Sequence, residues 1–245
     1  MKRNIKIIVE YDGSDYCGWQ VQPQVSTVQD ELKKAIFNIT KESVTLIGSG
    51  RTDTGVHAKN QVAHFHTESS IKAEIFAKAI NSQLPRDIVV KKSESVALDF
   101  HSQYQARAKA YSYTIFTSKH RPVLRRNYVY WSRRNLDIDL MREGASYIVG
   151  TYDFSSFEAA KSPRNSSIRT INKVDIEKEN CYITTLLEAN GFLYKMVRNI
   201  MGTLIEVGYK KYSPSKIKDI LRAKNRDFAG VTAPSHGLCL EYVLY

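Results

Sequence analysis

The hydrophobic and polar positions in the first half of the chain predict the order strand, helix, strand, strand, helix, strand. Short runs of alternating or continuous apolar residues predict strands, and apolar residues at helical spacing predict helices. The expected strands are 5–11, 44–47, 61–67 and 88–95. The expected helices end near Thr40 and Gln83, the second because Pro85 follows it.

The second half repeats this order from residue 106. Its expected strands are 106–116, 168–178, 182–189 and 238–243, and its expected helices are 140–149 and 193–207. A short extra helix is expected to start at Ser213-Pro214, with proline in its first position. This order is that of the split βαβ, ferredoxin-like unit, which RNA-recognition domains share. We therefore predict an α+β protein with halves 1–98 and 105–245, joined edge to edge into one large antiparallel sheet with a central cleft.

Charge is distributed unevenly along the chain. The net charge is +11, and residues 119–134 carry six Lys or Arg and no acid. Residues 190–226 carry nine Lys or Arg against two acids. Aromatic residues lie among the cations of the first stretch, as suits phosphate contact combined with base stacking. These stretches predict a polyanionic partner, and charge alone leaves RNA, DNA and an anionic membrane surface open.

The cellular setting follows from what the chain lacks. No apolar run approaches the roughly 20 residues that span a bilayer, and the N-terminal residues have the pattern of a strand and not of a signal peptide. Cys17, Cys181 and Cys239 are far apart, which is typical of reduced thiols. We expect a cytoplasmic protein with no membrane partner.

The stretch Gly48-Ser-Gly-Arg-Thr-Asp-Thr-Gly-Val-His-Ala58 is expected to be a loop between two strands. Its three glycines allow a sharp turn or a close approach to a ligand. Asp53 is the candidate nucleophile, and Arg51 would keep its carboxylate ionised. From the pattern alone, Asp53 as a structural turn residue is an equal alternative.

Other residues carry two interpretations each. Tyr111 and Tyr113 share one face of a strand with Arg107 and Lys109. The tyrosines could pack in the core, or one could stack on an extruded base; the two cations favour a nucleic-acid face. Arg198 lies on an apolar helix and could reach solvent or pair with Asp53.

Three histidines suggest a metal site as one alternative. His64 and His66 share a face of one strand, and His57 precedes them. No Asp, Glu or Cys completes a ligand set at suitable spacing, so we predict hydrogen-bonded histidines and no metal.

Several motifs together resemble the tRNA pseudouridine synthase A family. They are GSGRTDTGVHA, YDGSDYCGWQVQP, KAYSY, GTYDFSSF, SSIRTI, FLYKMVRNIMGTLIEVG and TAPSHGLCLEYV, in an order that spans the chain. The resemblance implies an isomerase that converts uridine to pseudouridine at tRNA positions 38, 39 and 40, in the anticodon stem-loop. It also implies two ferredoxin-like halves around a basic cleft, a homodimer, and no cofactor or metal.

The resemblance also assigns roles to residues. It implies that Asp53 is the nucleophile, that Tyr111 meets the target base, that Arg51 assists base flipping, and that Arg198 is the basic partner of Asp53. The predicted RNA contacts are Arg51, Phe100, His101, Ser102, Gln103, Tyr104, Arg107, Lys109, Arg164 and Arg169. One departure stands out: Gln103 occupies a position at which many relatives have arginine, which removes one phosphate-binding charge.

Two points stay open. Attack of Asp53 on C6 of the uracil or on C1′ of the ribose fits the pattern equally well. The competing functions are a non-catalytic RNA-binding protein with two RNA-recognition-like halves, and a nucleoside hydrolase that uses Asp53. Neither competing function needs turnover to pseudouridine, so an assay for that product separates them from the isomerase.

Overall fold

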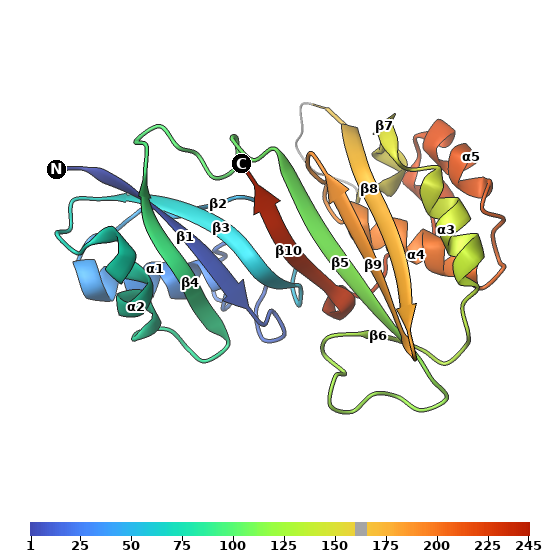
Figure 1. The fold of residues 1–245 in the computed structure, drawn as a ribbon, viewed down its shortest axis with the longest axis horizontal. Coiled ribbons are helices and arrows are strands. Elements are labelled where there is room, and N and C mark those ends of the chain that lie inside the picture. Colours follow the sequence, from blue (N-terminus) through green and yellow to red (C-terminus); the bar gives the residue numbers. More distant parts are fainter. Residues whose placement is uncertain (160–165) are drawn as a thin grey trace. The chain divides into compact units, whose positions relative to one another are not determined.

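The computed structural model describes residues 1–159 and 166–245, and the chain divides into two compact units (Figure 1). The first unit contains residues 1–107 and 239–245, and the second contains residues 108–238. The division falls close to the expected 98–105 boundary. It differs at the C-terminus, because the closing strand, expected in the second half, groups with the first unit.

The first unit is a sheet with two helices. Its strands in spatial order are β4 (Ile88–Val96), β1 (Arg3–Tyr11), β3 (His57–Thr67) and β10 (Leu238–Leu244), with the two-residue β2 (Ile47–Gly48) also beside β3. The helices are α1 (Val28–Thr40) and α2 (Phe76–Asn81), the latter preceded by the 3₁₀ turn η1 (Ala73–Ile75). Apart from the two-residue β2, the strands arise where the apolar pattern predicts them.

Alternation along β1 builds the core of this unit. Ile5, Ile7 and Val9 are fully buried, and the residues between them are mostly less so. On β3, Phe65 packs edge-on against Phe76 of α2, with ring centroids 5.5 Å apart. Burying side chains of this size contributes about 1.5–3 kcal/mol each to the free energy of unfolding. The β1–β3 pair is therefore well packed where it supports the loop that joins β2 to β3.

The sheet is not wholly antiparallel, which corrects the prediction. Strands β1, β3 and β4 pair antiparallel, but β10 runs parallel to β3, with Cys239 opposite His57 and Leu240 opposite Ala58. Parallel pairing requires a long connection between the strands, and here most of the second unit lies between them in sequence. Hydrophobic alternation is the same in parallel and antiparallel strands, so the sequence pattern could not indicate the direction in which β10 pairs.

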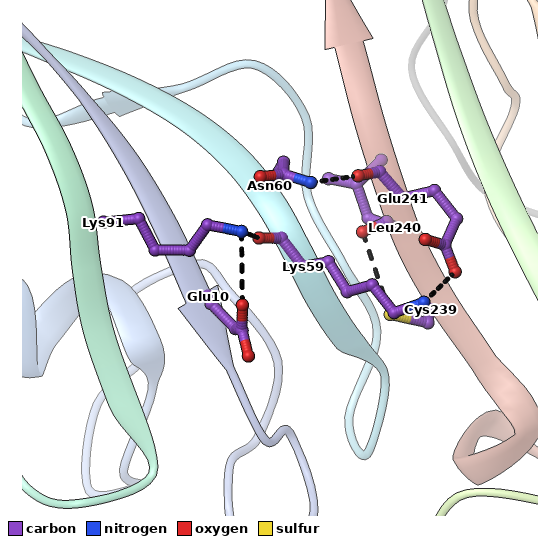
Figure 2. A network of polar contacts seen from close by, with 7 residues as sticks. All are labelled: Glu10, Lys59, Asn60, Lys91, Cys239, Leu240 and Glu241. Atoms are coloured by element: carbon purple, nitrogen blue, oxygen red, sulfur yellow. Dashed lines mark hydrogen bonds and ion pairs between the residues drawn. The ribbon is translucent and has the colours of Figure 1, made fainter.

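Polar contacts reinforce this short parallel pairing (Figure 2). Asn60 donates to the Glu241 carbonyl at 2.7 Å, and the Lys59 ammonium lies 2.9 Å from the Glu241 carboxylate. Lys91 of β4 donates to the Lys59 carbonyl at 2.9 Å. The C-terminal strand is thus held to β3 directly after the loop that carries Asp53.

The second unit also combines strands with helices. In spatial order its strands are β5 (Ala108–Thr117), β9 (Tyr182–Ala189), β8 (Ile168–Glu179) and β7 (Gly150–Asp153), with β6 (Tyr130–Ser132) parallel to β5. Its helices are α3 (Ile138–Ser146), α4 (Met196–Gly208) and α5 (Lys216–Ala223), and the 3₁₀ turns η2 (Ser155–Phe157), η3 (Arg226–Phe228) and η4 (Ser235–Gly237) connect elements. Helices α3, α4 and α5 lie together beside β8 and β7 in Figure 1.

Several details differ from the sequence prediction, among them α3, which ends at Ser146 and not at residue 149. Strands β6 and β7 were not expected, since three or four residues give too few positions to show a period. Helix α4 begins at Met196 and not at residue 193, because Lys195 has a left-handed φ of 58°. Pro214 lies before α5, whose N-cap is Ser215. The mixed α+β class is confirmed. Among the described residues, no helix combines the length and apolar content needed to cross a membrane.

Candidate active site

The start of the Gly48–Ala58 loop is fastened to β3. Ser49 donates its backbone N–H to the Val62 carbonyl at 2.7 Å, and its hydroxyl donates to Gln61 at 2.7 Å. The Gln61 amide in turn donates to the Gly50 carbonyl at 2.9 Å. Ser49 and Gln61 are both fully buried. This end of the loop is therefore attached to β3 by both main-chain and side-chain hydrogen bonds.

Thr52 fixes the middle of the loop. Its hydroxyl lies 2.8 Å from the Tyr11 phenol, and its carbonyl accepts from the Trp19 N–H at 3.1 Å. Burial raises the pKa of Tyr11 well above its usual value, so the phenol stays protonated and can bond a neutral hydroxyl. Thr52 is buried, whereas Arg51 is exposed and Asp53 is half-buried. The two charged side chains thus flank an anchored residue.

Gly18 allows this arrangement. Its φ is +85°, and a Cβ at this position would lie 2.5 Å from the Thr52 carbonyl oxygen and 3.1 Å from the Asp53 carbonyl carbon. Only glycine adopts this conformation freely and accepts such a close approach. The segment before α1 and the loop around Asp53 are therefore in direct backbone contact.

The turn that closes the loop depends on the main chain of Asp53. Val56 donates its N–H to the Asp53 carbonyl at 3.1 Å, and Gly55 has a φ of +75°. Beyond it, buried His57 accepts from the Gly13 N–H at 3.0 Å. These contacts close the turn through the main chain of Asp53 and through His57, and the role of the Asp53 side chain stays a prediction.

In the second unit, the structure distinguishes the two strand tyrosines. Tyr113 is fully buried, its hydroxyl donates to the Pro234 carbonyl at 3.0 Å, and Gly237 packs on its ring. Tyr111 stands opposite Leu187 on β9 and meets Phe192 edge-on, with centroids 5.3 Å apart. Tyr113 therefore has a structural role. Tyr111 is also buried, with 8% of its surface exposed, and its contact with a base stays a prediction.

Arg198 is fixed to the segment that follows η3. Its guanidinium Nε donates to the Ala233 carbonyl at 2.8 Å, and Ala233 donates its N–H to the Arg198 carbonyl at 3.0 Å. Gly202, one turn later, has no room for a Cβ, which would lie 1.6 Å from the Val231 carbonyl oxygen. Arg198 is thus half-buried and oriented, and does not simply extend into solvent. Its pairing with Asp53 stays a prediction.

The predicted RNA-contacting segment 100–104 is tied down by buried polar groups. Ser102 is fully buried: its hydroxyl donates to the Ile47 carbonyl at 2.7 Å, and its N–H donates to His64 at 3.2 Å. The prediction of an RNA contact by Ser102 is therefore wrong, because its side chain anchors the segment to β2 and β3. By contrast, Gln103 is exposed, and Tyr104 is 79% exposed.

The aromatic residues of this segment fall into two groups. Tyr104 packs on His101 with centroids 4.1 Å apart and an interplanar angle of 21°. Phe100 contacts Tyr245, and the Lys6 ammonium lies 5.7 Å from both of these ring centroids. Phe100 is therefore part of a packed cluster, and the stacked pair of His101 and Tyr104 reaches the surface.

Two of the predicted RNA-binding cations lie near one another in the second unit. Burial, and then the charge of Arg169, lower the pKa of Lys109 to about 8. Arg169 donates to the Ser166 and Ile168 carbonyls at 3.0 and 2.6 Å. Arg107 is exposed. Arg164 lies outside the described residues.

The histidines of β3 are held in hydrogen bonds. His66 Nε2 lies 3.0 Å from the Leu98 carbonyl, and His64 bonds Ser102. Burial, followed by the nearby His101 and His66, lowers the pKa of His64 to about 4, so this ring is neutral at pH 7. Within residues 1–159 and 166–245, no group of three or more His, Cys, Asp or Glu is placed to hold a metal ion.

Sequence reasoning missed the support of the loop. The YDGSDYCGWQ motif contains three residues that contact the backbone or side chain of the loop at Thr52 and Asp53: Tyr11, Gly18 and Trp19. The motif itself was a signal for them. Gln61 had none, because a polar residue in an alternating strand gives no indication of a buried partner.

Comparison with known proteins identifies the family. The family model described as tRNA pseudouridine synthase matches residues 7–105 and 145–245, more than half of the chain. The chain belongs to this family. The matched stretches include the Asp53 loop, the segment 100–104 and Arg198, and they leave out residues 106–144, which carry Tyr111.

Curated relatives cover the omitted stretch as well. The chain is 46% identical over 243 residues to tRNA pseudouridine synthase A 2 of Clostridium perfringens, 47% identical to tRNA pseudouridine synthase A of Clostridium acetobutylicum, and 48% identical to that of a Thermoanaerobacter species. Each alignment spans 99% of this chain and all of the relative. The family membership therefore extends over both units.

Proposed function

We propose that this protein is a tRNA pseudouridine synthase, which isomerises uridine to pseudouridine at positions 38, 39 and 40 in the anticodon stem-loop. The observation that carries the proposal is the full-length similarity to proteins named tRNA pseudouridine synthase A, across a loop whose framework holds Asp53 in place. An isomerase needs neither an oxidant nor an activated donor, since substrate and product have the same atoms. The alternative of a non-catalytic RNA-binding protein is not favoured.

In the proposed mechanism, Asp53 is the nucleophile. The carboxylate adds to C6 of a flipped-out uracil or attacks C1′ of its ribose, and the glycosidic N1–C1′ bond breaks. The base rotates, C5 bonds to C1′, the C5 proton leaves and the Asp53 bond is released. A loop fixed at Ser49, Thr52 and His57 supports this role, because a positioned nucleophile loses little entropy in reaching the base.

Other residues assist this step. Exposed Arg51 takes part in extruding the base, at a cost of a few kcal/mol for unstacking. Tyr111 contacts the base and assists departure of the C5 proton. Arg198 is the basic partner of Asp53, and its bond to the Ala233 carbonyl supports a fixed orientation of its guanidinium.

Several finer features belong to the proposal. RNA is contacted by Arg51, Phe100, His101, Gln103, Tyr104, Arg107, Lys109, Arg164 and Arg169. The two halves are ferredoxin-like around a basic cleft, and the order β4-β1-β3-β2 in the first unit supports this. The protein acts in the cytoplasm as a homodimer.

The test uses tRNA labelled with tritium at uracil C5, since C5 loses its hydrogen only when it becomes the attachment point. Wild type is expected to release tritium from the labelled tRNA, and with unlabelled tRNA to give a product of unchanged mass. Asp53→Asn is expected to abolish release while tRNA affinity survives, because the shape is kept and the nucleophile is lost. Undiminished release by Asp53→Asn would place the nucleophile elsewhere. Release of free uracil by wild type would instead indicate a hydrolase.

A further inference from the structure

The segment 119–134 of the second unit is a basic surface, and neither the proposed mechanism nor the RNA contacts named above include any of its residues. It links β5 to the residues before α3 and contains β6, and Figure 1 shows it as a long connection that extends beyond the end of β5. Its six cations are Lys119, Arg121, Arg125, Arg126, Arg133 and Arg134. All six are exposed. The family model does not match this segment.

These cations lack neutralising partners on the described part of the chain. Within residues 1–159 and 166–245, none of the six lies within salt-bridge distance of a carboxylate. Exposed lysines elsewhere in the same unit do have such partners: Lys211 lies 3.1 Å from Glu206, and Lys224 lies 3.5 Å from Asp153. The segment thus concentrates six positive charges whose counter-charge must come from solution or from a partner.

The segment is ordered by its own contacts. Strand β6 pairs with β5, with Ile115 opposite Tyr130 and Thr117 opposite Ser132. The Trp131 indole donates to the Ser118 carbonyl at 2.9 Å. Arg126 donates to the Val123 carbonyl at 3.0 Å, which closes the tip of the connection. The cations are therefore presented on a folded support and not on a free tail.

Two of the guanidinium groups are already oriented by aromatic rings. Arg125 lies 5.3 Å from the Tyr182 ring centroid, and Arg134 lies 4.8 Å from that of Tyr209. A guanidinium held against a ring can still direct N–H groups outward, and its flat fork matches two oxygens of a phosphate. Exposed Tyr128 and Trp131 add rings on which an unpaired base can stack.

We propose that residues 119–134 form a tRNA-binding surface that grips the sugar–phosphate backbone through Arg121, Arg125 and Arg133. The proposal rests on the proposed function, which makes RNA the substrate. A second copy of this chain fits less well, because a two-fold contact through the segment would oppose six cations with the same six. An RNA backbone supplies one negative charge per nucleotide, and the phosphate fork of arginine suits it.

The test compares two triple variants that each remove three positive charges. Arg121→Gln/Arg125→Gln/Arg133→Gln changes the proposed surface. Lys34→Gln/Lys92→Gln/Lys173→Gln is the matched control, since its lysines lie outside both basic stretches and each pairs with a nearby carboxylate. The Kd of a full-length tRNA transcript is measured from 50 to 400 mM KCl for both variants and for wild type.

The arginine variant is expected to flatten the plot of log K against log salt by about 2, because each lost phosphate contact contributes about 0.7. The control is expected to keep the wild-type slope. Equal slopes for all three proteins would overturn the proposal. A change in sedimentation from one oligomeric state to another in the arginine variant alone would also overturn it, since the segment would then be a contact between copies.

A single substitution guards against misfolding of the triple variant. Arg121→Glu reverses one exposed charge and is expected to flatten the slope by about 1 or more. The tritium assay on wild type separates this proposal from the proposed function. If wild type releases tritium and the slopes are equal, only the RNA-binding surface is refuted. If wild type releases none, the isomerase is refuted and the slopes still decide whether the segment binds RNA.

Discussion

Gly18→Ala is the substitution that tests most directly whether the framework of the Asp53 loop controls the chemistry. The new Cβ would lie 2.5 Å from the Thr52 carbonyl oxygen, whereas ordinary contact begins near 3.4 Å. The carbonyl therefore has to retreat by about 0.9 Å to reach ordinary contact, and Asp53 moves with it. An L-residue at the observed φ of +85° also costs about 1–2 kcal/mol.

The expected loss of stability follows from these two terms. Overpacking typically costs about 1–3 kcal/mol, so the free energy of unfolding should fall by about 2–5 kcal/mol in all. A domain is stable by only about 5–15 kcal/mol, so the variant is expected to fold with a lowered midpoint in urea. Turnover should fall by roughly 10²-fold, the usual consequence of misplacing a reacting group by about 1 Å.

The assay combines urea denaturation with tritium release at saturating tRNA. Gly191→Ala is the matched control, because its Cβ would meet only Arg169, at 3.7 Å and beyond, and no left-handed φ is involved. That control should keep turnover and change stability by less than about 1 kcal/mol. If Gly18→Ala keeps both wild-type stability and wild-type turnover, the contact with Thr52 does not position Asp53 and the reasoning fails.

Three further predictions test single groups. Tyr111→Phe should lower turnover by roughly 10²- to 10⁴-fold in the tritium assay, the usual effect of losing an acid–base group. Tyr113→Phe should instead lower the free energy of unfolding by about 1–3 kcal/mol in urea denaturation, because the buried Pro234 carbonyl loses its partner, and should leave most turnover intact. The reverse pattern would exchange the roles of the two tyrosines. Tyr11→Phe should cost about 1–3 kcal/mol in the same denaturation, since it removes the partner of buried Thr52, and an unchanged midpoint would contradict this. The pKa of His64 is about 6.5 in the unfolded chain and about 4 in the folded protein, so the unfolded chain takes up the proton first as pH falls. The free energy of unfolding should therefore fall between these pH values, by up to about 1.4 kcal/mol per pH unit. In His64→Gln, the free energy of unfolding should depend less on pH across this range.

The C-terminal strand illustrates where the sequence pattern stops being informative. Apolar alternation at 238–243 indicated a strand, but a strand can pair with any exposed edge in either direction. Its place beside β3 depends on register and on side chains distant in sequence, such as Asn60, which bonds the Glu241 carbonyl. The short strands β6 and β7 and the late start of α4 were invisible for a related reason, since a few residues or one left-handed φ leave no periodic signal.

For the candidate site, local composition alone determined a glycine-rich loop with one carboxylate and one guanidinium, the basic stretches, and two strand tyrosines with equal claims. The motifs resembled a family that comparison then confirmed. Only the tertiary structure decided that Tyr113 bonds the Pro234 carbonyl, that Ser102 is a buried anchor, and that Gly18 and Tyr11 hold the backbone beside Asp53. The physical reason is that these roles depend on burial and on contacts with residues 34 or more positions away in sequence. Periodicity reports which face of an element is apolar, and it does not report what that face meets.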